Sequence, residues 1–387
     1  MRIVDICEST VAISRYADPA LCPATLDTSV VAVVTDTGAV GYGFASIGRF
    51  AQAGLIRERF APRLRAADPA ALIGELPGAA RAVIDPRKAW AAMMRDEKPG
   101  GHGERCVAVG ALDMALWDLA AKAADQPLHR LLRAVYDGPA EPTPVPVYAG
   151  GGYYFPGDDL QHLADEARYF AGLGIPSLKI KIGGRPLAED LRRVETVLAV
   201  VGGGDRLAVD AMNRYAPDAA LQAAGALAPY RLRWFEDICD PLDFETHRRV
   251  AAAYAPPVSA GEALFSAADA RNLLRYAGLR PGHDVLTFDP AHCYGLPEYL
   301  RIIGLFEAAG WSRRDFQPHG GHLFGLQVAA GLGLGGCECN PHNFQPFGGF
   351  ADRQRIVDGS VPPPDAPGIG FECRAALIDL LRARLGG

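Results

Sequence analysis

The sequence predicts an α/β protein, a (β/α)7-8 barrel of the TIM type preceded by an α+β domain. Three observations lead to this fold class. The first 140 residues change from strand-like alternation to a helical pattern, a proline-rich run follows, and about eight short apolar segments then alternate with helices. Repeated βα units in that number, without a Gly-rich nucleotide-binding turn, favour a barrel over a doubly wound sheet.

The α+β domain is expected over residues 1–140. Residues 2–13 and 29–45 alternate in strand fashion, and Asp36-Thr37-Gly38 interrupts the second run as a hairpin turn. From about residue 51 to 132 the pattern becomes helical, and residues 106–124 form the clearest long helix with an apolar face. We therefore expect an antiparallel meander followed by helices.

The barrel is expected over residues 141–344, after the proline-rich run GPAEPTPVPVYAG (138–150), which marks the domain boundary. A C-terminal segment, 345–387, follows it. The strand candidates are, in order, VPVYAG, SLKIKIG, RLAVDA, RLRWFED, PVSAGEA, DVLTFDP, DFQPHGG and CECN. Ala- and Arg-rich helices separate them, as the connections of a parallel barrel require.

Composition limits the classes of function. The chain has 387 residues, 49% hydrophobic and 22% charged, with a net charge of -6. An acidic balance argues against nucleic acid as the main partner. The N-terminus carries Asp5 and Glu8 where a secretory signal needs an apolar run, and no uninterrupted apolar stretch reaches membrane-spanning length. We expect a cytoplasmic protein without a membrane partner, and its eight scattered cysteines are expected to be reduced.

A polar residue stands at the end of each central strand candidate. These residues follow one another at intervals of 26 to 30 positions, apart from the last interval of 19. They are Lys181, Asp210, Glu236, Glu262, Asp289, His319 and Glu338. A repeat of one βα unit places all seven side chains at the carboxyl end of the barrel strands, where barrel enzymes carry their active sites.

Lys179 and Lys181 lie in a short apolar run bounded by Pro176 and Gly183. Positions i and i+2 of a strand point the same way, so the two ammonium groups would repel each other and one pKa would fall toward neutrality. Lys181, at the strand's carboxyl end, is the candidate base, and Lys179 is its electrostatic partner. A solvated edge strand is the alternative for a KxK pair taken alone.

Asp210, Glu236 and Glu262 come from three successive strands and would repel one another strongly unless a cation lay among them. An all-oxygen set without histidine or cysteine favours a hard divalent ion, above all Mg²⁺. Each acid taken singly could instead be a helix cap or a loop acid.

Asp289 and His319 form a candidate carboxylate–imidazole pair on the far side of these acids. Such a carboxylate orients a catalytic histidine and raises its basicity. His322 follows in PHGGH, an HxxH form that would fit zinc only weakly because the HExxH helix signature is missing. Lys98 lies in the Gly-rich loop DEKPGGHGER (96–105), which could also be an ordinary solvated connection.

In its KxK strand, its Asp–Glu–Glu trio and its Asp289/His319 pair, the sequence resembles the enolase superfamily in its mandelate racemase-like branch. The resemblance implies that the N-terminal domain caps the barrel and that residues from about 345 onward complete it. It implies roles as well. Lys181 would take the proton alpha to a carboxylate, His319 would assist departure of the beta hydroxyl, and Glu338 would line the site.

Several stretches, including NLLRYAGLRP and EKPGGHGERCVAVG, look most like D-tartrate dehydratases and related acid-sugar dehydratases of this family. The resemblance implies conversion of a hydroxy diacid, D-tartrate first, to a 2-keto acid, with Lys98, Lys179 and His322 contacting the substrate. It also implies a homo-oligomer. Alternatives are another aldarate or aldonate dehydratase, a racemase or epimerase, and a non-catalytic barrel that binds metal and diacid.

Two places depart from the family's pattern. Met212 stands where many relatives have Asn, with Asn213 one position later, and a thioether cannot replace an amide's hydrogen bonds. The loops at 17–27 and 45–50 carry few polar groups, with Leu21 and Ile47 where substrate contacts are expected.

Overall fold

The N-terminal domain is built on a three-stranded antiparallel sheet. The computed structural model describes residues 1–17, 26–136, 138–139 and 144–386. Strands β1 (Ile3–Ile13), β2 (Leu26–Thr35) and β3 (Val40–Phe44) pair in the order β1-β2-β3. Gly38, with a φ of 80°, supplies the left-handed residue that the turn between β2 and β3 requires. The predicted meander is confirmed.

Helices cover one face of this sheet. The longest, α5 (Glu104–Ala123), is buried from Cys106 to Ala121 because it packs against β2 and β3 on one side and the barrel on another. The remaining elements are α1 (Ala53–Leu55), a π-helical turn (Ile56–Phe60), α2 (Ala61–Ala66), α3 (Pro69–Leu72), β4 (Ile73–Gly74), β5 (Val83–Ile84), α4 (Pro86–Met93) and α6 (Leu128–Val135).

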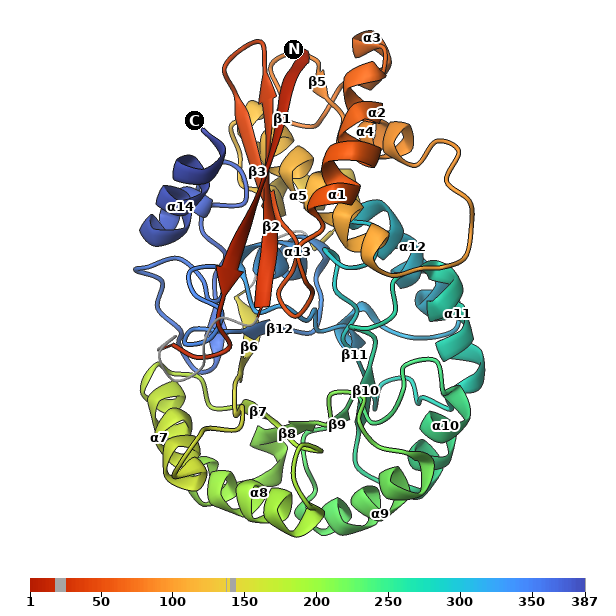
Figure 1. Cartoon of the computed structure of the whole chain (residues 1–387), viewed down its shortest axis with the longest axis vertical. Coiled ribbons are helices and arrows are strands. Elements are labelled where there is room, and N and C mark those ends of the chain that lie inside the picture. The colour runs from red at the N-terminus through yellow and green to blue at the C-terminus, as the bar shows by residue number, and fades with distance from the viewer. Residues whose placement is uncertain (18–25, 137, 140–143, 387) are drawn as a thin grey trace.

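The second domain is a parallel sheet curled into a barrel, with its helices outside (Figure 1). Its strands are β6 (Val145–Gly150), β7 (Leu178–Lys181), β8 (Leu207–Asp210), β9 (Phe235–Glu236), β10 (Val258–Ala260), β11 (Val285–Leu286) and β12 (Cys337–Cys339). Its helices are α7 (Asp159–Gly172), α8 (Leu187–Val201), α9 (Pro217–Leu227), α10 (Phe244–Ala253), α11 (Ala267–Tyr276), α12 (Leu296–Glu307) and α13 (Leu323–Leu332). Neighbouring strands follow the chain from β6 to β11, and β12 pairs with β6.

The strand predicted at DFQPHGG (315–321) does not form as a regular strand. It begins with a 3₁₀ turn (Arg313–Asp315) and makes one isolated bridge, between Leu286 and Phe316. Pro318 lacks the N–H that a ladder needs, and Gly320 has a φ of 107°. The segment still closes the barrel, because the Gln317 N–H donates to Leu286 and the Glu338 N–H donates to Pro318.

The C-terminal segment returns from the barrel to the N-terminal domain. Strand β13 (Ser360–Val361) pairs antiparallel with β6, and α14 (Ala375–Leu385), after a 3₁₀ turn (Phe371–Cys373), packs against β1 and β2. Figure 1 shows α14 beside the three-stranded sheet. The predicted boundary between residues 140 and 141 lies outside the described residues. No helix in the described part of the chain is both long and apolar enough to cross a membrane.

Strand β3 packs so closely on α5 that one added methyl group should lower the stability of the fold. A Cβ at Gly43 would collide with the backbone oxygen of Ala111 in α5. We expect Gly43→Ala to lower the free energy of unfolding by about 1–3 kcal/mol, as overpacking does. The matched control is Gly225→Ala on α9, where a Cβ meets no atom within 4 Å. That change should stabilise the protein by about 0.5–1 kcal/mol. Denaturant unfolding measures both, and equal stability of the two variants would contradict the packing described.

Candidate active site

The barrel strands align the polar residues at their carboxyl ends. In the parallel pairing, Lys181 of β7 lies beside Asp210 of β8, and Asp210 lies beside Glu236 of β9. Glu262 follows β10 after Gly261, whose φ of 142° turns the chain at the strand's end. The polar residues that recur once per βα unit, here Lys181, Asp210, Glu236 and Glu262, therefore lie at the same end of neighbouring strands, as the sequence predicts.

Three carboxylates form the floor of the site. Asp210, Glu236 and Glu262 each offer an oxygen within 4.8 Å of the others. Asp210 accepts from the Met212 N–H at 2.7 Å, and Glu236 accepts from Trp234 Nε1 at 2.5 Å. Oε2 of Glu262 is buried without a hydrogen bond, and the nearby His319 Nε2 lies 3.4 Å away. An all-oxygen set with a buried acceptor still unsatisfied fits a hard divalent cation.

The two lysines of β7 are buried and paired with these acids. Lys179 Nζ lies 2.5 Å from Glu236 and 3.4 Å from Glu338, and Lys181 Nζ donates to Asp210. The solvated-edge alternative for the KxK pair is therefore excluded.

The lysine pKa values do not fall as expected. Burial lowers the pKa of Lys181 and so does Lys179, but Asp210, Tyr153 and Glu262 together outweigh both and raise it. Burial likewise lowers the pKa of Lys179, and Glu236 and Glu338 raise it well above its usual range. Both lysines therefore balance carboxylate charge in the structure as it stands.

Asp289 and His319 form the expected pair. His319 Nδ1 lies 3.0 Å from Asp289 Oδ2, and Ser46 Oγ donates to the same oxygen at 2.6 Å. The opposite ring nitrogen, Nε2, is 3.4 Å from Glu262. Burial lowers the pKa of His319, but Glu262 and Asp289 outweigh it and raise the pKa to about 9. The imidazole is therefore protonated at neutral pH and can donate a proton.

A cavity of about 240 Å³ opens above the acids and joins the two domains. Lys181, Glu262 and His319 line its barrel side. Arg15 and the loop 47–49, which ends in Arg49, line its N-terminal side. A site of this size suits a small molecule. Loops from the N-terminal domain thus complete a site whose acids and bases come from the barrel.

Several lining or supporting residues were missed by sequence reasoning. His292 lines the cavity, packs at a tilt against His319 with ring centres 5.4 Å apart, and leaves its buried Nε2 without a hydrogen-bond partner among the described residues. Its position three residues after Asp289 was a usable signal. Ser46 and Arg49 lie in a loop that was judged poor in polar groups, and only the fold shows that this loop reaches the site.

None of the three predicted substrate contacts, Lys98, Lys179 and His322, is among the residues that line the cavity. Lys179 is fully buried and paired with Glu236 and Glu338. Lys98 is exposed on its loop and is not among the lining residues. His322 is fully buried, accepts the Gly325 N–H at 3.2 Å as the cap of α13, and packs edge-on against Phe44. Burial lowers the pKa of His322 to about 4, so its ring is neutral. These placements do not support any of the three residues as a substrate contact.

The departure at Met212 is accommodated by the backbone. Met212 and Asn213 both have positive φ values, 53° and 58°, and Met212 holds Asp210 through its N–H rather than its side chain. Asn213 instead donates its amide to Asp237 at 3.1 Å. Leu21 lies outside the described residues, whereas Ile47 does line the cavity.

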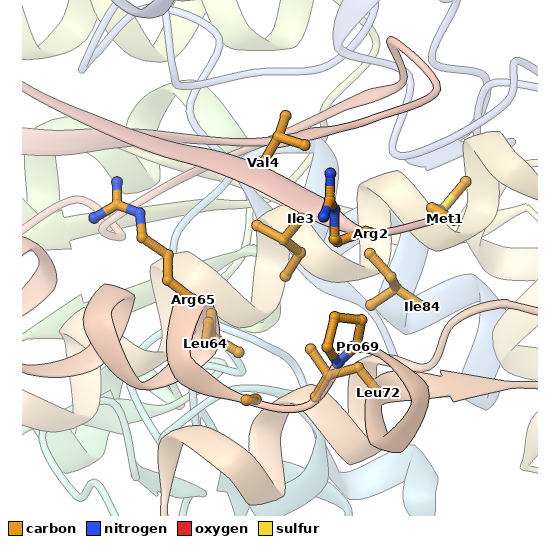
Figure 2. Close-up of a pocket in the computed structure, with 10 residues that line it drawn as sticks. Met1, Arg2, Ile3, Val4, Leu64, Arg65, Pro69, Leu72 and Ile84 are labelled. Atoms are coloured by element: carbon orange, nitrogen blue, oxygen red, sulfur yellow. The ribbon is translucent and has the colours of Figure 1, made fainter.

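A second hollow, of about 420 Å³, lies beside the start of β1 and helices α2 and α3 (Figure 2). Among its ten lining residues only Arg2 and Arg65 are charged, and Arg65 is already paired with Asp5. No acid–base pair or carboxylate group lines it. The chemistry of the molecule therefore lies in the smaller cavity between the domains.

Comparison with known families agrees with this architecture. The family "Enolase C-terminal domain-like" matches residues 162–377, and the N-terminal domain of "Mandelate racemase / muconate lactonizing enzyme" matches residues 23–133.

Several relatives are named as enzymes of sugar acids. The chain is 32% identical to a 3,6-anhydro-alpha-L-galactonate cycloisomerase of Streptomyces coelicolor, over 73% of this chain and 74% of that one. It is 27% identical to an arabinonate dehydratase of Saccharolobus solfataricus, over 72% and 73% of the two chains. It is 29% identical to the L-talarate/galactarate dehydratase of Salmonella typhimurium, over 70% and 64%.

Solved structures give the same result. A racemase from Streptomyces coelicolor A3(2) with bound magnesium superposes with a TM-score of 0.77 at 26% identity, covering 97% of this chain and 99% of that one. An L-talarate dehydratase from Polaromonas sp. JS666, complexed with Mg and L-glucarate, superposes at 0.74 with 27% identity over 95% and 94%. The acidic trio and these two domains agree with the magnesium prediction. The chain belongs to the enolase superfamily and carries both domains of its mandelate racemase/muconate lactonizing enzyme branch.

Proposed function

We propose that the protein is a Mg²⁺-dependent acid-sugar dehydratase. The observation that carries this proposal is the order of groups around the barrel. Lys181 and His319 flank the trio of Asp210, Glu236 and Glu262, one on each side in strand order. A base and an acid placed on either side of an acidic metal site suit removal of a proton and departure of a hydroxyl from adjacent carbons.

Mg²⁺ held by the trio would polarise the substrate carboxylate and offset the carboxylate charge that raises the pKa of Lys181. Lys181 would accept the proton alpha to the carboxylate. The carboxylate group holds the electron pair left by the broken C–H bond, and in a second step this pair forms a carbon–carbon double bond as the beta C–O bond breaks. The leaving oxygen takes the proton of His319 and departs as water, and the enol tautomerises to a 2-keto acid.

The remaining groups would set charge and orientation. Asp289 holds the His319 ring through Nδ1 and so directs Nε2 toward the reacting centre. Ser46 fixes Asp289 in turn. Lys179 and Glu338 lie behind the reacting groups, 3.4 Å apart, and the Gly320 N–H holds Glu338 at 2.9 Å. Lys179 would keep the buried acids charged, and Glu338, which is buried and not among the lining residues, would act on His319 through its charge at 4.0 Å from Nε2.

The substrate is a hydroxy acid of the sugar-acid class, with D-tartrate, which would give oxaloacetate, first among those to test. Relatives named for arabinonate, gluconate and L-talarate/galactarate dehydration support the reaction type. D-Tartrate itself rests on the sequence stretches that resemble tartrate dehydratases. Homo-oligomeric assembly and a cytoplasmic location remain expectations from that resemblance and from the sequence.

A second candidate is a racemase, epimerase or cycloisomerase, because the cycloisomerase relative at 32% identity belongs to the same family. It would share the step at Lys181. Deuterium uptake from solvent without loss of water would favour this candidate. Binding of metal and diacid without any product would favour the non-catalytic barrel.

Turnover tests the reaction. With Mg²⁺ and a panel of aldonates and aldarates that includes D-tartrate, we expect a 2-keto acid from at least one member. Lys181→Met removes the amine and keeps the stem, so turnover should fall by about 10²–10⁴-fold. Lys88→Met is the control, since Lys88 lies on the exposed surface of α4 and bonds only to Ile73. A Lys181→Met enzyme with intact turnover would rule out the proposed base.

Metal binding tests the trio separately. Glu262→Gln removes one charge from the only trio member that has a buried oxygen without a donor. Mg²⁺ affinity should weaken by at least about 10–100-fold, the effect known for residues that merely support metal ligands. Titration calorimetry, together with the rise in melting temperature that Mg²⁺ produces, measures this. Glu245→Gln, on the outer surface of α10, should bind as the unaltered protein does; equal affinity in Glu262→Gln would refute the assigned site.

A further inference from the structure

One buried histidine beside the acidic trio has no part in the proton transfers proposed above. His292 lies in the turn that follows β11, three residues after Asp289, and is 2% exposed. Its Nδ1 lies 3.2 Å from the backbone oxygen of Glu262. Its Nε2 is buried, and no residue in the described part of the chain forms a hydrogen bond with it. The hydrogen bonds of the fold therefore do not explain a buried imidazole at this position.

Several groups converge on one oxygen of Asp289. His319 Nδ1 lies 3.0 Å from Asp289 Oδ2, and His292 Nδ1 lies 3.7 Å from the same oxygen. The centres of the two imidazole rings are 5.4 Å apart, and the rings are tilted by 33°. Asp289, His292 and His319 each offer a ligand atom within 4.8 Å of the other two. All three side chains are buried, so packing holds the group together.

These separations suit a metal ion. Zn²⁺ binds imidazole nitrogen and carboxylate oxygen at about 2.0–2.2 Å and favours a tetrahedral arrangement, which places neighbouring ligand atoms about 3.3 Å apart. The 3.0 Å and 3.7 Å separations at Asp289 Oδ2 lie on either side of that value. Small shifts of the two rings would therefore complete a set of three ligands.

The other nitrogen of His319 stands where a metal-bound histidine needs it. A metal-binding imidazole usually donates its second ring N–H to a carboxylate or a carbonyl oxygen. His319 Nε2 lies 3.4 Å from Glu262 and 4.0 Å from Glu338. His292 and His319 also line the cavity, which leaves a fourth position on the ion open to water.

The types of ligand atom distinguish this group from the trio. The trio offers only oxygens, which suit Mg²⁺, whereas two imidazoles favour Zn²⁺, Co²⁺ or Ni²⁺. The HxxH form in the sequence pairs His319 with His322 instead. In the structure His322 caps α13 and does not belong to the group, and His292 is the ring that lies beside His319.

We propose that Asp289, His292 and His319 form a second metal site, which takes a borderline divalent cation, Zn²⁺ first, and that the ion bound there inhibits the enzyme. Binding at His319 Nδ1 would displace the proton that this nitrogen shares with Asp289. The ring would keep one proton, on Nε2, and its release would leave an imidazolate, so His319 would no longer serve as an acid. The metal site stands apart from the proposed function, whereas the inhibition rests on it.

Calorimetry tests the site on the whole chain in saturating Mg²⁺. We expect Zn²⁺ to bind tightly with one equivalent. His292→Gln removes one ligand, so Zn²⁺ affinity should fall by at least about 10–100-fold, the effect known for residues that merely support metal ligands. Mg²⁺ affinity should be unchanged, because the trio is intact. His162→Gln, at an exposed histidine on α7, is the matched control and should bind Zn²⁺ as the unaltered protein does.

X-ray absorption at the zinc edge identifies the ligands. We expect two imidazoles around Zn²⁺ in the unaltered protein and one in His292→Gln, a change that a general distortion of the site would not produce. Absence of tight Zn²⁺ binding, equal Zn²⁺ affinity in His292→Gln, or an ion surrounded by oxygens alone would each overturn the site. If His292→Gln loses both metals, the spectrum of the unaltered protein decides.

Inhibition is measured on any sugar acid that the protein turns over. Zn²⁺ should inhibit the unaltered enzyme at concentrations at least about tenfold lower than it inhibits His292→Gln, in line with the loss of affinity. Zn²⁺ binding without inhibition would overturn the inhibitory role. If no sugar acid is turned over, the dehydratase proposal fails, and the calorimetry and the zinc spectrum still decide whether the second site exists.

Discussion

Mutual repulsion among three clustered carboxylates, two buried and one partly buried, is the constraint on which the rest of the site depends. Asp210, Glu236 and Glu262 lie within 4.8 Å of one another, beneath the cavity at the carboxyl end of the barrel. Charges at that separation are costly in a medium less polar than water unless cations lie among them. Lys179 and Lys181 supply part of the compensation, and Oε2 of Glu262, still without a donor, marks where more is needed.

This constraint explains why the base and the acid stand where they do. Lys181 is drawn to Asp210 at one end of the trio, and His319 lies 3.4 Å from Glu262 at the other. The same carboxylates that require a cation therefore position both groups and raise the pKa of His319 to about 9. One cluster of side chains therefore sets both the electrostatic balance and the proton transfers. Substitution of one metal ligand should change the metal affinity and the pKa values of the acid and the base together.

The N-terminal domain completes the cavity from the other side. The barrel supplies the acidic trio, Lys181 and His319, whereas Arg15 and Arg49 lie in the segments that follow strands β1 and β3. Helix α5 fixes that sheet against the barrel, with Gly110 so close to the Ala291 backbone that a side chain has no room. The N-terminal sheet that carries these segments is therefore packed closely against the barrel through α5.

Much of this site could be predicted because its residues recur once in each βα unit of the barrel. Lys181, Asp210 and Glu236 follow one another by one βα unit, and strand pairing places such residues side by side. The irregular segment at 315–321 was expected as a strand because the pattern counts apolar residues and does not weigh the missing N–H of Pro318. The rest of the cavity could not be predicted for a different reason. Arg15, Arg49 and His292 stand in loops without periodicity, and only tertiary packing brings them to the cavity, while His322 and Lys98 carry suitable chemistry but lie elsewhere.

Separating the two halves of the reaction tests the central claim most directly. His319→Asn leaves Lys181 in place and removes the group that would protonate the leaving hydroxyl. In D₂O with Mg²⁺ and a sugar acid that the unaltered enzyme dehydrates, we expect loss of water to fall by about 10²–10⁴-fold while deuterium still enters at the carbon alpha to the carboxylate. Loss of both reactions together, or dehydration at an unaltered rate, would contradict separate roles for Lys181 and His319.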